Sequence, residues 1–238
     1  MLSLPPDDRT SNRSYMRIVG WALLALGLID IFYILIGADW MNPVAELRVG
    51  GRLAEHALAL LLGLLLLLLP AGDKFTPKEA RTLSKLSKLG LVLGALYLLL
   101  IPFLLLSAFR IQRALTKQTT TWVEQQEKLT QGAIDKLNDI RTHEDVEIFV
   151  QPLQFDENMF YEPDLQVLKG NLADRFHEIN AGNIERSEEV LGERLGKVWT
   201  DTAKWVIASL ITAAAFVLMG LKGRRYGRLA SAAKQQGK

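Results

Sequence analysis

The side chains in this chain that could do chemistry include one acidic cluster beside a histidine. His143 is followed by Glu144, Asp145 and Glu147, a set of metal-ligand types within five residues. A metalloprotease helix needs two histidines four residues apart, with a glutamate beside the first as the general base. The cluster has a single histidine, and the two other histidines of the chain lie far away in the sequence. We therefore interpret it as a solvated charged turn and predict no metal site.

Other catalytic signatures are also missing from the sequence. The chain has no P-loop, no G-x-S-x-G turn and no glycine-rich nucleotide turn. It has no cysteine, so disulfides, cysteine-ligated zinc and iron–sulfur clusters are excluded. We expect a protein that is not an enzyme, with no catalytic residues and no cofactor.

One carboxylate stands inside a long apolar run and needs a partner. Asp30 lies about two-thirds of the way along that run, where an unpaired charge would cost a few kcal/mol if the run crosses a bilayer. Arg52 and His56 begin the next apolar run and would lie at a similar depth. A structural ion pair is favoured over a proton or ion relay, because a relay normally shows more than one acidic residue at depth.

Four apolar blocks dominate the elements that must position these side chains. Each is about as long as a bilayer-spanning helix, which needs ~17 to 25 residues. A chain of 238 residues could not bury four helices that are apolar on every face in a soluble core. We predict an all-α fold with four transmembrane helices, over residues 18–38, 53–69, 89–109 and 205–221. Gly90 and Gly94 form a G-x-x-x-G pattern in the third, where we expect close helix approach.

The basic residues predict the orientation of these spans. Fourteen lysines and arginines lie in the segment before span one, in the loop 70–88 and after span four, whereas the first loop offers only Arg48 and Arg52. By the positive-inside rule both termini face the cytoplasm, and the segment between spans three and four faces the other side of the membrane. The predicted domains are 1–17 (cytoplasmic), 18–109 (three spans), 110–204 (outer module), 205–221 (fourth span) and 222–238 (basic cytoplasmic tail).

The outer module 110–204 is predicted to be a long helical hairpin or coiled coil. Apolar residues spaced by threes, fours and sevens continue the third span to about residue 141. The positions Ile184, Leu191, Leu195 and Val198 form an a/d seam that runs directly into span four. A contact with a partner protein and a closed helical bundle both remain open as the role of this seam.

Two further elements are expected between these long helices. A shorter amphipathic helix should begin after Pro163 and end near Gly182. Residues 146–150 alternate apolar and polar side chains, which favours a short extended piece, and Pro152 and Pro163 exclude a helix through the tip. The module carries 18 acidic and 12 basic residues, so its net charge of −6 argues against nucleic acid as a partner.

Two stretches resemble a known family. The M-N-P-x-x-E turn after span one, Met41 to Glu46, and the junction LLLIPFLLLSAFRIQR at the end of span three are similar to HpsJ-type membrane proteins of cyanobacteria, which are named for hormogonium polysaccharide. The layout of spans and helical segment is similar too. The resemblance implies a cyanobacterial integral membrane protein linked to export of a motility-associated polysaccharide, with no catalytic residues to carry over. The membrane is then the plasma or the thylakoid membrane, and residues 110–204 are periplasmic or lumenal.

Two hypotheses of function follow. The first is a non-enzymatic accessory or scaffold subunit of an envelope assembly, whose partners are the lipid bilayer and other membrane or envelope proteins; a homo-oligomer stays open. The second is a small channel or transporter component that uses Asp30. A conducting path should show several polar residues along the spans, and spans two to four offer few beyond the interfaces, which favours the scaffold.

Overall fold

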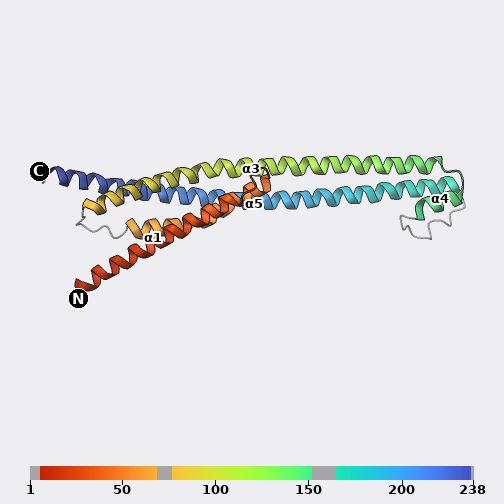
Figure 1. Cartoon of the computed structure of the whole chain (residues 1–238). Coiled ribbons are helices and arrows are strands. Elements are labelled where there is room, and N and C mark those ends of the chain that lie inside the picture. Colours follow the sequence, from red (N-terminus) through yellow and green to blue (C-terminus); the bar gives the residue numbers. More distant parts are fainter. Residues whose placement is uncertain (1–5, 69–76, 152–163, 237–238) are drawn as a thin grey trace, which may run out of the picture. The chain divides into compact units, whose positions relative to one another are not determined.

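The computed structural model describes residues 6–68, 77–151 and 164–236, and these residues are helical almost throughout (Figure 1). The helices are α1 (Pro6–Ile36), α2 (Pro43–Leu68), α3 (Pro77–Asp139), α4 (His143–Val150) and α5 (Leu165–Gln236). The predicted all-α class is confirmed, and no strand occurs within the described ranges.

Four of these helices, α1, α2, α3 and α5, are long and apolar enough to cross a membrane. Each begins before the apolar block that predicted it, and α3 and α5 also continue past the end of theirs. The helix that contains the second block, for example, begins at Pro43, ten residues before Leu53. The helices are longer than the apolar blocks because a helix ends where its backbone loses its hydrogen-bond partners, at Pro and Asn turns. The polarity of the side chains does not set this point.

The chain divides into two units, residues 1–111 with 198–238, and residues 112–197. Both α3, with 63 residues, and α5, with 72, contribute to both units without a break. The prediction that the third span continues as a helix to about residue 141 is confirmed. The predicted helix end near Gly182 is wrong, because α5 runs on through this residue. A glycine inside a helix costs only about 1 kcal/mol relative to alanine, which the surrounding turns can offset.

Close backbone approach joins α1 to α2 in the first unit. A Cβ added at Gly63 would lie 2.9 Å from the Leu24 backbone nitrogen and 3.0 Å from the Gly20 carbonyl oxygen, closer than real Cβ atoms normally come. Small residues at such a crossing let two helices pack where no hydrophobic effect drives them together. Leu24, Leu60 and Leu64 fill the space on either side and are almost fully buried.

The predicted close approach at Gly90 and Gly94 is confirmed, with α5 as the partner. A Cβ at Gly94 would lie 2.8 Å from Val217 Cγ2, and one at Gly90 would lie 3.3 Å from the Phe216 carbonyl oxygen. On the same face, Ser87 donates a hydrogen bond of 2.5 Å to the Gly220 carbonyl oxygen. Small residues therefore set the packing of α3 against α5 in this unit.

The second unit has a small core of its own at the end of α3. Five fully buried side chains form it, and they come from α3, α4 and α5: Leu137, Val146, Val150, Leu168 and Leu172. The extended piece predicted over residues 146–150 is wrong, because these residues form α4. Val146 and Val150 stand four residues apart on one helical face, and a lone strand here would leave its backbone groups without a ladder partner.

Side chains cap the helix ends around this core. The Thr142 hydroxyl accepts a hydrogen bond of 3.2 Å from the Asp145 backbone N–H, so the cluster read as a charged turn is the first turn of α4. The Asp164 carboxylate accepts one of 2.8 Å from the Gln166 N–H at the start of α5. The buried Lys169 ammonium donates to the carbonyl oxygens of Asn138, at 2.9 Å, and Ile140 at the end of α3. Residues 152–163, with Pro152 and Pro163, lie outside the described residues.

Candidate functional site

A tight turn between α1 and α2 positions the first residue of the site. The Asn42 side-chain oxygen accepts a hydrogen bond of 3.0 Å from the Val44 N–H, and Pro43 occupies the first helical position. Asn at the N-cap followed by Pro is a favoured helix start, because Asn satisfies a free N–H and Pro has none to satisfy. One turn later Glu46 points into the protein and is only 6% exposed.

The buried carboxylate of Glu46 is held by α3. An Arg110 guanidinium nitrogen lies 2.9 Å from Oε1 and 2.6 Å from Oε2 of Glu46. The Ser107 hydroxyl lies 3.4 Å from Oε2 and also donates a hydrogen bond of 3.0 Å to the Phe103 carbonyl oxygen. The side chain of Arg110 is about half exposed, so the pair joins a buried anion to a cation that reaches the surface. Such a pair fixes the position of two helices more than it supplies reactive chemistry.

Two glycines next to this pair bring α3 and α5 onto α2. A Cβ at Gly50 would lie 2.5 Å from Leu104 Cδ2 of α3, and one at Gly51 would overlap the indole ring of Trp205 of α5. The Trp205 indole nitrogen donates a hydrogen bond of 3.1 Å to Glu55, whose carboxylate also lies 3.8 Å from Lys204 Nζ. Helix α2 therefore contacts α3 through Gly50 and Glu46, and it contacts α5 through Gly51 and Glu55.

Aromatic rings gather near these charged residues. Trp40 packs edge-on against Phe103, with ring centroids 6.3 Å apart, and Phe109 packs edge-on against Trp199 at 5.1 Å. Trp residues mixed with ion pairs at the ends of apolar helices are typical of the boundary between membrane and water. The charged and aromatic residues of this unit thus agree with membrane insertion of its four apolar helices.

The structure brings together two of the three residues predicted as a polar pair. His56 Nδ1 lies 3.4 Å from Asp30 Oδ2, and both side chains are about half exposed. Arg52 is exposed, and among the described residues Asp30 has its ion pair with His56 and none with Arg52. That this pair is structural, and not part of a proton or ion relay, stays a prediction.

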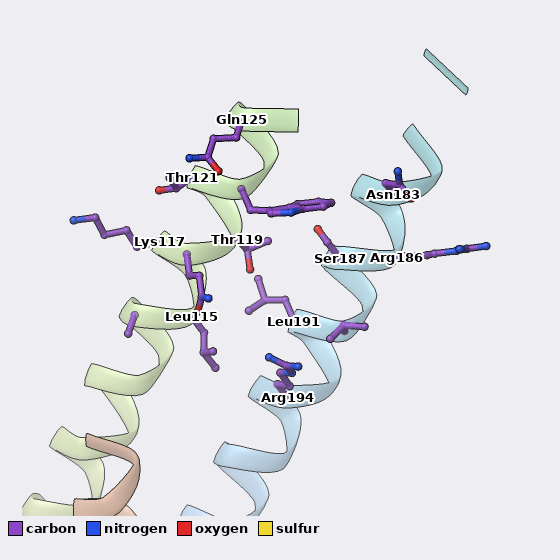
Figure 2. A pocket seen from close by; sticks show the side chains of 14 residues that line it. Leu115, Lys117, Thr119, Thr121, Gln125, Asn183, Arg186, Ser187, Leu191 and Arg194 are labelled. Atoms are coloured by element: carbon purple, nitrogen blue, oxygen red, sulfur yellow. The ribbon is translucent and has the colours of Figure 1, made fainter. Parts of the chain in front are cut away.

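The predicted seam residues are half-buried. Ile184, Leu191 and Leu195 lie in the second unit and Val198 belongs to the first, so the seam as a whole stays a prediction. In the second unit an open groove of about 1000 Å³ lies between α3 and α5. Figure 2 shows Thr119, Ser187 and Leu191 between the two helices. Fourteen residues line the groove, eight from α3 and six from α5: Ala114, Leu115, Lys117, Gln118, Thr119, Thr121, Trp122, Gln125, Asn183, Arg186, Ser187, Val190, Leu191 and Arg194.

The two motifs of the resemblance meet in the ion pair of α2 and α3. Glu46 is the acid of M-N-P-x-x-E, and Arg110 begins the R-I-Q-R that follows the third apolar block. A family model described as HpsJ-like protein matches residues 12–225. The chain belongs to the HpsJ-like family. The match includes the ion pair, the Asp30–His56 contact and the groove of this HpsJ-like protein. No curated protein and no solved structure gives a significant match to the chain.

Sequence reasoning missed the Glu46–Arg110 pair, although a signal for it existed. Both residues stand at the polar edge of an apolar block, 64 positions apart, and each belongs to a stretch that carries the family resemblance. Two charges of opposite sign at the same end of neighbouring spans are natural candidates for a pair. A charge inside a span, such as Asp30, stands out from its apolar neighbours, whereas a charge beyond the end of a span does not.

Proposed function

We propose that this HpsJ-like protein is a non-enzymatic membrane scaffold or accessory subunit of a polysaccharide export or motility assembly in cyanobacteria. It engages envelope partners through residues 110–204. Family membership supports the link to hormogonium polysaccharide. The observation that carries the scaffold role is the length of α3 and α5, which have 63 and 72 residues. A span needs only about 20 residues, so each helix continues far beyond what a bilayer requires.

The proposed topology places both termini in the cytoplasm and residues 110–204 in the periplasm or the lumen. The basic residues in the first turns of α1 and after the fourth apolar block support it. In this arrangement the Glu46–Arg110 pair and the nearby tryptophans lie at the outer boundary of the membrane. The pair then fixes α3 at the point where it leaves the lipid.

The experiment that tests the scaffold is a comparison of co-purified proteins. The full chain and a variant in which a short helical hairpin replaces residues 115–195 are purified in mild detergent, and their partners are identified by mass spectrometry. Because the replacement keeps all four apolar helices, both proteins should be present in the membrane. Partners recovered with the full chain should be lost from the variant. Identical partner sets would contradict a scaffold that acts through the outer module.

A second candidate is a channel or transporter component, favoured by the contact between Asp30 and His56. The acid and the imidazole lie 3.4 Å apart within helices apolar enough to span a membrane, and both are groups that proton relays use. The Asp30 substitutions in the Discussion distinguish this candidate from the scaffold.

A further inference from the structure

The groove between α3 and α5 has a charge opposite to that of the segment around it. Residues 110–204 carry 18 acidic and 12 basic side chains. Among the fourteen residues that line the groove, three are cationic, Lys117, Arg186 and Arg194, and none is acidic. In Figure 2 Lys117 extends outward from α3 and Arg186 outward from α5, so these two cations lie on opposite sides of the groove.

Part of the groove lining is apolar and incompletely covered. Leu115 and Trp122 come from α3, and Val190 and Leu191 come from α5. Val190 is 45% exposed although it lies on this apolar strip. Apolar side chains that stay partly exposed beside one another indicate a surface that can take a binding partner.

The two features together define the chemistry of the occupant. An amphipathic helix places an apolar stripe into a groove and keeps its polar residues at the rims. Acidic residues on both sides of that stripe would meet Lys117 and Arg186. A second copy of this chain fits poorly through the same face, because an isologous contact would set the cations of one groove against those of the other. A neutral sugar chain would offer no charge to the three cations of the lining.

We propose that this groove binds an acidic amphipathic helix of a partner protein. The proposal rests on the scaffold function and names the chemistry of its partner. The apolar stripe of that helix packs on Val190, Leu191 and Trp122, while its acidic flanks pair with the cations at the rims.

Site-specific photocrosslinking in cells tests the proposal on the full chain. The photoreactive amino acid p-benzoylphenylalanine replaces Val190 in one variant and Ile179 in another. Both are branched apolar residues of α5 in the second unit, with exposures of 45% and 44%, but only Val190 lines the groove. An adduct with a different protein should form at 190 and not at 179. Mass spectrometry should place the crosslink in an amphipathic helical segment with a net negative charge.

Charge reversal provides the second arm. Arg186→Glu with Arg194→Glu should reduce the adduct at 190 by about tenfold or more, because both cations would become repulsive. Lys197→Glu, an exposed cation of α5 outside the groove, is the matched control and should leave the adduct unchanged. Arg186 and Arg194 are both exposed. The abundance of each variant is measured together with its adduct, so that a loss of protein is distinguished from a loss of binding. Reversal of an acidic residue in the identified helix to Lys should restore the adduct of the double variant.

Several outcomes overturn the proposal. An adduct of twice the mass of the chain would assign the groove to a second copy, and an adduct with carbohydrate or lipid would assign it to another class of ligand. Equal adducts at 190 and 179, or a crosslinked segment that is basic or lacks an apolar stripe, would also refute it. If partners co-purify with the full chain but no adduct forms at 190, the groove proposal fails and the scaffold stands. If no partner co-purifies either, the proposed function itself fails.

Discussion

A guanidinium nitrogen of Arg110 lies 2.6 Å from a carboxylate oxygen of Glu46, and the two residues are buried to very different degrees. Glu46 is 6% exposed, whereas the Arg110 side chain is about half exposed. Removal of the arginine would therefore leave a buried charge without its partner, but removal of the acid would leave a cation that water can solvate. This asymmetry gives the pair a testable signature.

Arg110→Ala should destabilise the protein more than Glu46→Gln. An uncompensated buried carboxylate costs about 3 to 5 kcal/mol, while Gln keeps the size of the side chain and can still hydrogen-bond to Ser107. The thermal midpoint of the detergent-solubilised protein measures the difference. Arg113→Ala, an exposed arginine one turn later, is the control and should change the midpoint little. If Glu46→Gln proves the more harmful of the two, the asymmetry argument is wrong.

The proposed topology predicts which exposed positions a membrane-impermeant thiol reagent can reach. The chain has no cysteine, so a single introduced one reports its own accessibility. Leu129→Cys should be labelled in intact cells if the protein is in the plasma membrane, whereas Lys85→Cys should be labelled only after permeabilisation. Labelling of Lys85→Cys alone in intact cells would invert the topology.

The continuity of α5 predicts a strong effect of proline at Leu195. Proline removes a helix hydrogen bond and clashes with the preceding turn at a cost of about 3 kcal/mol or more. Leu195→Pro should therefore increase the protease sensitivity of residues 112–197 in membrane vesicles. Leu195→Met keeps the apolar contact and the helix, so it should behave like the parent. Equal protection of the proline variant and the parent would refute the role of the seam.

Substitutions of Asp30 separate the scaffold from the transporter. Asp30→Asn can still hydrogen-bond to His56 but cannot ionise, so a scaffold should keep its abundance and its partners. Asp30→Leu should lower abundance, since the imidazole of His56 then loses its carboxylate partner. Quantitative blotting and co-purification measure both effects. If Asp30→Asn keeps abundance and partners yet abolishes the cellular phenotype of the parent gene, the ionisable carboxylate is functional and the transporter replaces the scaffold.

The buried Lys169 predicts a local effect at the end of α3. Lys169→Met removes the donor to the carbonyl oxygens of Asn138 and Ile140, and hydrogen bonds from charged groups contribute about 1.5 to 3 kcal/mol each. Amide hydrogen exchange over residues 137–150 should become faster by at least about tenfold. Lys136→Met, at an exposed lysine in the last turn of α3, is the matched control. Similar exchange in the two variants would show that the ammonium does not hold this end.

The small core of the second unit shows why the sequence alone misassigned residues 146–150. The alternation of Val146, Ile148 and Val150 with polar neighbours is the period of a strand, and the same letters also place Val146 and Val150 on one helical face. Only the tertiary structure supplies Leu137, Leu168 and Leu172, which cover this helical face, while no neighbouring strand is present among the described residues to pair with an extended one. The Thr142 cap then starts the helix.

The sequence by itself determined the features that depend on composition and on period. Four apolar blocks predict four helices of bilayer length because lipid leaves a backbone no other way to satisfy its hydrogen bonds. The G-x-x-x-G pattern at Gly90 and Gly94 predicted a close approach, but the tertiary structure chose α5 as the partner. It also decided that Asp30 meets His56 and not Arg52, and that Glu46 meets Arg110 across 64 residues. Which residues pair depends on how two helices are rotated and shifted against each other. Side-chain packing between distant segments determines this arrangement, and the local pattern along one helix does not contain it.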